Sequence, residues 1–334
     1  MQVRINPRKC GVMCTALAAA LSLLLAAAGT AAAATTLRIA YNPNATNTSI
    51  VVAVQQGYFA QHGLNVQLTT SADTTALLPA IGKQFDLVGA GPTSILQFAQ
   101  QGNKPVLVGA QNIANATTDR NDYLLADKNI TTLSQLAGQT VGVTSLSGTM
   151  YDALLYQLQQ IGISASQVKF LVVPFADEQS DLQSGAIQAT ITIQPFASTL
   201  LSAGYSDLGD PVEQTIHDQT ALSIGWVGYR PWVESHPKVI AEFDAAQEEA
   251  LKWMAANEAG CVQILETDFQ LSAVAAQKYP VTQYVAFKVK PTYLSDWVAP
   301  LKAIGALPKS FKLPISQLVY TPPSPSKHGH GSKH

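Results

Sequence analysis

Short apolar runs alternate with segments of helical periodicity through the first two thirds of the chain. Short runs rich in Val, Ile, Leu and Tyr, here three to six residues long, are typical of strands buried on both faces. They predict strands at Leu37–Tyr41, Phe85–Val88, Val106–Ala110, Tyr123–Ala126, Val141–Val143, Val168–Val173, Ala189–Ile193 and Ile224–Tyr229. Between them, residues 50–56 and 151–161 place apolar side chains on one helical face. This alternation predicts an α/β fold with mostly parallel strands.

The last third of the chain has a helical pattern instead. Pro237 suits the first position of a helix, and apolar residues recur at helical spacing from Val239 to Met254. Further helix is predicted at 262–265 and 293–304. We find no internal repeat of the kind that a duplicated domain leaves.

Polar loops follow four of the predicted strands, and each loop opens a predicted helix. In a parallel sheet these loops lie at the carboxyl ends of strands, where ligands bind and helix N-termini present free N–H groups. Ser, Thr and Asn are also the preferred N-cap residues, so a single such loop indicates only capping. Four together favour a site, and they span residues 42–49, 89–94, 144–149 and 194–195.

These four loops contain no charged residue. Their amides, hydroxyls and N–H groups therefore predict either a monoanion or a neutral polar ligand, and disfavour a metal. Arg120 lies among acidic residues, and two interpretations stay open for it: a surface position or a ligand contact. Trp226 and Tyr41 could likewise stack on an aromatic ligand or pack in the core.

The two ends of the chain are predicted to lie outside the folded part of the protein. Basic residues, an apolar run from Ala16 to Ala28 and the small residues Ala32–Ala34 have the order of a secretory signal, with cleavage expected after Ala34. The alternative is an uncleaved membrane anchor. Residues 321–334 hold Pro, Ser, Gly, Lys and His and predict a disordered tail, whose His328, His330 and His334 have no spacing that fixes a metal geometry.

Charge and cysteine content narrow the function further. Residues 1–34 contain three basic and no acidic residues, so the expected mature chain has 17 basic against 22 acidic groups. This balance does not attract nucleic acid. Only Cys261 remains in that mature chain, which excludes an internal disulfide.

Catalytic and metal-binding patterns are scarce. Cys261 falls in a predicted helix with no histidine nearby in sequence, so it is expected to be a buried apolar residue. His217 with Asp218 is the one His–acid neighbour pair that could approach a cleft. No phosphate-binding Gly-rich loop and no His-Glu-x-x-His motif occurs. We therefore expect no cofactor, no metal and no enzymatic activity.

Five short motifs follow one another in a characteristic order. They are Gly57-Tyr58-Phe59 with Gly63-Leu64-Asn65-Val66, Gly82 with Phe85-Asp86-Leu87-Val88, Gly102-Asn103-Lys104-Pro105-Val106, Leu133 to Val143, and Leu182 to Ala189 with Gln194-Pro195. In this order they resemble the nitrate/sulfonate/taurine/thiamine-precursor-type solute-binding proteins of ABC importers. Two positions depart from the pattern, since Gln135 and Gln188 stand where the family usually has an acid. The resemblance extends from about Leu37 to Pro237.

The resemblance implies a two-lobed periplasmic-binding-protein fold of type II, with helices flanking a mostly parallel sheet in each lobe and the ligand cleft between them. The implied boundaries are a signal peptide at 1–34, one lobe at 35–122 plus 226–320, the other at 123–225, and a tail at 321–334. Lobe closure is then expected around the crossing strands. The ligand-binding residues implied by the family pattern are Asn42, Asn44, Asn47, Thr93, Ser147, Gly148, Thr149 and Gln194.

The implied function is a monomeric, exported receptor that captures a small solute and delivers it to an ABC permease. A sulfonate, taurine, nitrate or similar monoanion is the expected ligand. Two alternatives stay open: an enzyme on the same scaffold, of the desulfinase or pyrimidine-precursor synthase type, and a ligand sensor without transport.

Overall fold

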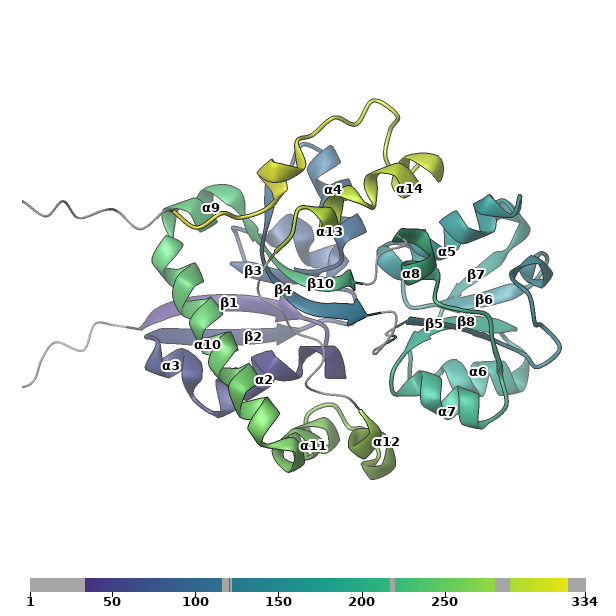
Figure 1. Cartoon of the computed structure of the whole chain (residues 1–334), viewed down its shortest axis with the longest axis horizontal. Helices are drawn as coiled ribbons and strands as arrows, with labels where there is room; N and C mark the ends of the chain where they lie inside the picture. The colour runs from purple at the N-terminus through teal and green to yellow at the C-terminus, as the bar shows by residue number, and fades with distance from the viewer. Residues whose placement is uncertain (1–33, 116–119, 121, 217–219, 280–288, 324–334) are drawn as a thin grey trace, which may run out of the picture.

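Two mixed sheets, each with helices on both faces, form the two halves of the protein (Figure 1). The computed structural model describes residues 34–115, 120, 122–216, 220–279 and 289–323. The leader predicted at 1–34, apart from Ala34, and residues 324–334 of the predicted tail lie outside these residues. Within the described ranges, no helix combines the length and apolar character that crossing a membrane requires.

Sheet 1 has the strand order β2-β1-β3-β10-β4. Its strands are β1 (Thr35–Tyr41), β2 (Leu64–Thr70), β3 (Leu87–Ala90), β4 (Pro105–Asn115) and β10 (Thr220–Tyr229). β1 pairs in parallel with β2 and β3, whereas β10 is antiparallel to both β3 and β4. Four of these strands therefore run in one direction and only β10 opposes them.

Sheet 2 repeats this arrangement with the order β7-β6-β8-β5-β9. Its strands are β5 (Asp122–Ala126), β6 (Thr140–Val143), β7 (Lys169–Val172), β8 (Ala189–Ile193) and β9 (Ser206–Asp207). β5 opposes its two neighbours, while β6, β7 and β8 are parallel. β5 and β10 are each the first strand that the chain forms after it crosses from one sheet to the other. All other strands within a sheet run in one direction, so the predicted α/β fold with mostly parallel sheets is confirmed.

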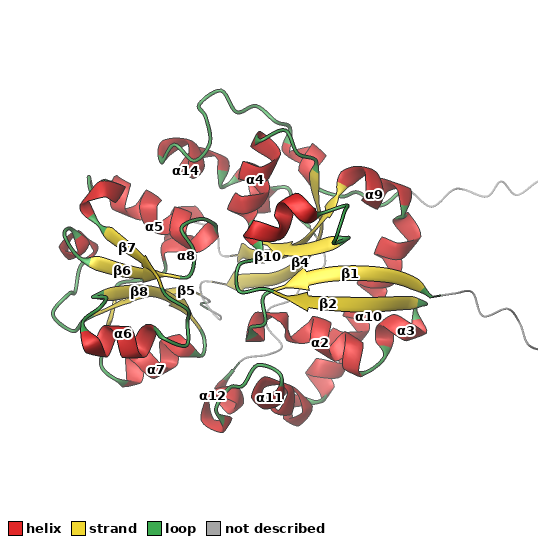
Figure 2. Ribbon diagram, turned by 180° about the vertical axis from the view of Figure 1, so that it is seen from behind, coloured by secondary structure: helices red, strands yellow, loops and turns green. Residues whose placement is uncertain are grey.

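Helices cover both faces of sheet 1 (Figure 2). One face packs against η1 (Ala45–Asn47), α2 (Thr48–Gln55), α3 (Tyr58–Gln61), α9 (Arg230–Ser235), α10 (Pro237–Ala256), α11 (Glu258–Thr267) and α12 (Ala273–Lys278). The other packs against η2 (Thr75–Ala80), α4 (Pro92–Gln100), α13 (Thr292–Ser295), α14 (Val298–Ala303) and η5 (Ile315–Leu318).

Sheet 2 is covered in the same way by shorter elements. They are η3 (Leu133–Leu136), α5 (Thr149–Gln160), η4 (Ala165–Gln167), α6 (Glu178–Ser184), α7 (Phe196–Ser202) and α8 (Pro211–Ile216). α5 packs on the face that carries Leu124 and Ile191, and α6 and α7 pack on the face of Leu125.

Alternate residues of the strands enter opposite cores. Val106 and Val108 of β4 belong to the cluster on the α10 face, whereas Leu107 between them belongs to the cluster on the α4 face. Trp226 and Val227 of β10 divide in the same way. This two-sided burial explains why the strands appear in the sequence as continuous apolar runs.

The predicted strands differ from the observed ones in several respects, among them the unpredicted β9 and the extension of β4 to Asn115. β2 was not predicted, although Leu64, Val66 and Leu68 alternate with polar residues along it, as a half-exposed strand requires. β10 begins four residues before the predicted strand, and Thr220–Gly225 pair with β4 in sheet 1. The helices expected at 50–56, 151–161 and 237–257 are present as α2, α5 and α10.

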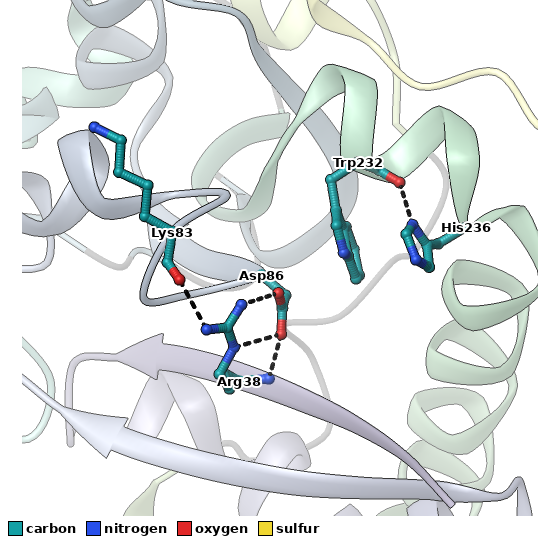
Figure 3. Close-up of polar contacts among 5 residues, drawn as sticks. All are labelled: Arg38, Lys83, Asp86, Trp232 and His236. Atoms are coloured by element: carbon teal, nitrogen blue, oxygen red, sulfur yellow. Dashed lines mark hydrogen bonds and ion pairs between the residues drawn. The ribbon is translucent and has the colours of Figure 1, made fainter.

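An ion pair ties β1 to the loop before β3 (Figure 3). The Arg38 guanidinium donates to both carboxylate oxygens of Asp86, with distances of 3.1 Å from Nε and 2.6 Å from Nη2. The backbone N–H of Arg38 also donates to Asp86, and Nη1 donates to the Lys83 carbonyl at 2.8 Å. Asp86 is 3% exposed, so this motif residue fixes the entry to β3.

Candidate functional site

A cavity of about 140 Å³ lies between the two sheets, and loops from both halves line it. From sheet 1 come the loops after β1, β2 and β3, together with part of β10; from sheet 2 come the loop after β6 and residues of β5 and β8. The polar and glycine lining residues are Asn42, Asn44, Thr46, Asp73, Thr74, Thr75, Gly91, Ser94, Asp122, Thr144, Ser145, Ser147, Gly148, Thr149 and Ser223.

The loop after β1 is held by its own asparagines. Asn44 is the N-cap of η1, and its Oδ1 accepts from the Thr46 N–H at 3.1 Å and from the Thr46 hydroxyl. Asn42 Nδ2 donates to the Ala72 carbonyl at 2.8 Å, which joins this loop to the one after β2. Asn42 and Asn44 therefore reach the cavity from a loop with little freedom to move.

Asn47 has a different place from its two neighbours. It is 1% exposed and does not line the cavity, and its Nδ2 donates to the Asn42 carbonyl at 2.9 Å. The structure thus places Asn47 behind the wall, where it fixes the backbone that presents Asn42.

The N-termini of α4 and α5 meet at the cavity, one from each half. The Thr93 and Thr149 hydroxyl oxygens are 3.5 Å apart. Gly148 precedes α5 with φ of +93°, in the region that favours glycine, and lies against Ser94 and Thr75. Ser147, Gly148 and Thr149 line the cavity, whereas Thr93 is fully buried beside Thr149.

Asp152 lies directly behind this contact, in the first turn of α5. It is 4% exposed, and Gln97 of α4 donates to its Oδ2 at 2.8 Å, a hydrogen bond between the two halves. Burial raises the pKa of Asp152 to about 6, while hydrogen bonds from Thr93 and Gln97 oppose that shift. A carboxyl group that changes charge in mildly acidic conditions therefore joins α4 to α5.

Gln194 is not brought together with the other predicted site residues. It lines a separate cavity of about 250 Å³ with Ser198, Ser202, Ser272 and others. Its amide donates to the Tyr123 hydroxyl at 3.1 Å and accepts from the Ser198 hydroxyl at 2.7 Å. The loop after β8 thus opens helix α7 without reaching the first cavity.

Sequence reasoning missed two acidic residues of the cavity wall. Asp73 comes from the loop after β2, and Asp122 is the first residue of β5 and 2% exposed. The prediction of a cleft without charged side chains is wrong, because the unpredicted strand β2 sends a fifth polar loop, Ser71–Thr75, to the same edge. The alternation in β2 was the signal that could have revealed it.

Arg120 and Trp226 are both occupied away from the cavity wall. The Arg120 guanidinium pairs with Asp207 at 2.6 and 2.8 Å and lies 4.0 Å from the centre of the Tyr123 ring. Trp226 is fully buried, and its indole N–H donates to Gln111 Oε1 at 2.8 Å. Tyr41 is 7% exposed in the same core, so packing, not ligand stacking, accounts for both aromatic residues.

The described residues contain no group of three or more His, Cys, Asp or Glu side chains arranged to hold a metal. Cys261 is fully buried in the core beside α10, and burial raises the pKa of its thiol to about 11. It therefore has the protonated, inaccessible state of a structural cysteine, as the sequence predicted. His217 lies outside the described residues.

Comparison with known proteins gives matches along most of the chain. A family model described as "NMT1/THI5 like" matches residues 44–259. The formylaminopyrimidine-binding protein of Halalkalibacterium halodurans is 24% identical over 234 residues, which cover 68% of each chain.

Solved structures share the fold at lower identity. The alkanesulfonate-binding protein SsuA from Xanthomonas axonopodis pv. citri, bound to MOPS, superposes with a TM-score of 0.69 at 19% identity, over 87% of this chain and 99% of that one. The periplasmic nitrate-binding protein NrtA from Synechocystis PCC 6803 gives 0.63 at 16% identity, over 83% of each chain. The desulfurization enzyme DSZB gives 0.59 at 14% identity, over 85% and 96%.

Proposed function

The chain belongs to the NMT1/THI5-like family, and on that premise we propose that it is the extracytoplasmic substrate-binding component of an ABC importer. The observation that carries the proposal is the cavity between the two sheets, lined by loops from both halves. A solute held there contacts both halves at once, so its binding energy favours the closed arrangement.

Two lobes are proposed to move against each other, with boundaries near 35–122 plus 226–320 and 123–225. The strand pairing differs from these boundaries at two places. Thr220–Gly225 of β10 pair within sheet 1, and Asp122 pairs within sheet 2. Thr93 with Thr149 and Gln97 with Asp152 already join the two halves in this structure, and we expect opening of the lobes to break both contacts.

The proposed ligand contacts come from five of the residues predicted from the sequence. Asn42, Asn44, Ser147, Gly148 and Thr149 line the cavity and offer amides, hydroxyls and backbone groups to a small polar solute. We propose that Asn47 and Thr93 position these ligand-contacting residues. Gln194 would contact the ligand only if its separate cavity joins the first one on closure.

Named relatives support solute capture of this kind. The similar proteins are named as binding sulfonate, nitrate or a formylaminopyrimidine. We propose that the protein acts outside the cytoplasmic membrane, after removal of the predicted signal peptide. It would act as a monomer and deliver its solute to an ABC permease.

Catalysis is the alternative, and the likeness to DSZB is the observation that favours it. Cys261 does not supply a nucleophile, because it is fully buried in the core of sheet 1 and does not line the cavity. We therefore propose that the chain acts as a receptor and not as an enzyme. Turnover of a bound solute by the purified protein, lost on His217→Ala, would revive the enzyme hypothesis.

Thermal denaturation of the mature protein with sulfonates, taurine, nitrate and pyrimidines tests the proposal. A solute at 100 times its dissociation constant stabilises the folded state by about 2.7 kcal/mol, which raises Tm by several degrees. Ser147→Ala with Thr149→Val should reduce the shift, while the exposed Ser166→Ala should not. Capture of the permease by immobilised protein separates transport from sensing.

A further inference from the structure

A hydrogen bond between side chains crosses from one half of the protein to the other behind the cavity. Gln97 of α4 donates it from Nε2 to Asp152 Oδ2 in the first turn of α5, at 2.8 Å. The hydroxyl oxygens of Thr93 and Thr149, 3.5 Å apart, join the same two helices. The contact between α4 and α5 therefore depends on one carboxyl group and on neutral polar partners.

The other half of the protein covers this carboxyl group. Met150 and Ala153, on either side of Asp152 in α5, pack against the core on the α4 face of sheet 1. Ala153 is fully buried there, and Asp152 itself is 4% exposed. Because this cover comes from the half that contains sheet 1, separation of α5 from α4 admits water to Asp152. Water stabilises the charged form of a carboxyl group more than the neutral form.

No positive charge compensates the burial of Asp152. The helices packed against α5 are α4, α8, α14 and η4, and neither α4 nor η4 contains a titratable residue. Among the described residues no cation forms an ion pair with Asp152, and the Lys302 ammonium of α14 donates to the Phe311 carbonyl at 2.8 Å. The other titratable residues around it are Tyr151 and Tyr156 of α5, Glu213 of α8, Asp210 before α8, and Asp73 and Asp122 in the cavity wall.

The direction of a pH effect follows from this burial. In the structure, burial raises the pKa of Asp152 from 3.8 to about 6, although hydrogen bonds from Thr93 and Gln97 oppose the shift. Opening of the halves would return the pKa towards its ordinary value. Between about pH 4 and pH 6 the closed arrangement then holds a proton that the open one has released, so closure becomes more favourable as pH falls. Two such pKa values change the closure equilibrium about tenfold between pH 7.5 and pH 5.

We propose that Asp152 makes the contact between the two halves sensitive to pH, so that the receptor closes more readily in mildly acidic than in neutral solution. This inference rests on the proposed lobe movement and specifies its regulation. A neutral carboxyl group keeps an oxygen that accepts from Gln97, whereas the carboxylate favours water and therefore the open arrangement. A solute that selects the closed arrangement then binds more tightly at pH 5 than at pH 7.5.

The test needs no ligand, because small-angle X-ray scattering of the mature protein measures the radius of gyration from pH 7.5 to pH 5. Asp152→Asn imitates the neutral carboxyl group and should remove the pH dependence. Gln97→Leu removes a donor to the carboxylate and should move the transition to higher pH. Asp210→Asn is the matched control. Asp210 is also buried, and burial raises its pKa too, but its carboxylate accepts from the Val212 and Glu213 N–H groups of its own half.

We expect the wild type and Asp210→Asn to become more compact as pH falls, with a ratio of closed to open protein that rises about tenfold, and Asp152→Asn to stay compact throughout. A wild-type radius of gyration that does not change with pH, or an equal pH response in Asp152→Asn, would overturn the inference. If Asp152→Asn does not fold, an unchanged transition in Gln97→Leu overturns it instead. Solute capture is tested separately, by thermal denaturation with the solute panel at one fixed pH, so a failure of the proposed function is distinguishable from a failure of the pH effect.

Discussion

The indole N–H of Trp226 donates to the Gln111 side chain at 2.8 Å, and this bond joins β10 and β4, the neighbouring strands of sheet 1 at which the chain returns from the other half and leaves for it. The Gln111 amide in turn donates to Ser49 Oγ at 2.9 Å and to the Thr46 carbonyl at 3.3 Å. The buried network therefore sets the position of the loop that carries Asn42 and Asn44. It connects β4 and β10 to one wall of the cavity.

Gln111→Leu should both destabilise the fold and weaken solute binding. The substitution leaves the buried Trp226 N–H without an acceptor and frees the loop before α2, which costs about 2–3 kcal/mol of unfolding free energy. Trp226→Phe is the complementary variant: it removes the donor of the same hydrogen bond and also leaves a cavity in the core, so it should be destabilised as well. Urea denaturation that shows equal stability for Gln111→Leu and the wild type would contradict this account.

A second prediction concerns Gly91, which precedes α4 at the contact between the halves. A Cβ at this position would overlap the Thr149 hydroxyl and also approach the Ser223 carbonyl at 3.4 Å. Gly91→Ala should therefore hinder closure and weaken solute binding about fivefold, a coupling of about 1 kcal/mol. Thr149→Ala removes the overlapping oxygen. The double variant Gly91→Ala/Thr149→Ala should therefore bind the solute more tightly than the sum of the two single losses in binding free energy predicts. Strict additivity in calorimetry would argue against the contact.

The Arg38–Asp86 pair provides a test of fold stability independent of the cavity. Asp86→Ala leaves the Arg38 guanidinium and backbone N–H without their acceptor, and we expect a loss of about 2–3 kcal/mol. Glu234→Gln is the control, because it breaks the exposed i,i+4 pair with Arg230, worth less than about 0.5 kcal/mol. Similar losses for the two variants would show that burial of Asp86 has no special role.

The sequence predicted the sheets more completely than the cavity. Strands buried on two faces leave continuous apolar runs, so β1, β3, β4, β6 and β8 were recognisable. The half-exposed β2 was not, and with it the sequence analysis missed Asp73. The charge of the cavity wall consequently became apparent only from the structure.

Residue type alone also did not distinguish residues that line the cavity from residues buried behind them. Asn42 and Asn47 belong to one loop and share one chemistry, yet Asn47 is buried and bonds to the Asn42 backbone. Gln194 follows a strand just as Ser147 does, but the direction of the loop after β8 sends it to another cavity. Such differences depend on the path of the backbone in three dimensions, which one sequence does not specify.

Glu178 should make the protein less stable as pH rises. Burial raises its pKa from 4.5 to about 8, although hydrogen bonds from Thr192 and Thr190 oppose the shift. Between pH 4.5 and 8 the unfolded chain releases this proton while the folded protein retains it, so the unfolding free energy falls across that window. Glu178→Gln should then be more stable than the wild type at pH 8, by at least about 1 kcal/mol, and close to it at pH 4. Glu258 is exposed and also lies in the first turn of a helix, so Glu258→Gln is the control. In thermal melts its difference from the wild type should not change between pH 4 and pH 8.

His62 should produce a second pH dependence of stability, in the window just above pH 6.5. Its Nδ1 lies 2.7 Å from Glu242 Oε2 and its Nε2 lies 3.1 Å from Glu249 Oε1, and these two glutamates of α10 raise the pKa of the imidazole above 6.5. The stabilisation is therefore complete below pH 6.5 and disappears as pH rises through the folded-state pKa. His62→Gln should lower the unfolding free energy at pH 5.5 by less than about 1 kcal/mol, because the groups are partly exposed, and hardly at all at pH 9. A difference between His62→Gln and the wild type that stays constant from pH 5.5 to 9 would show that α3 and α10 are held together by packing alone.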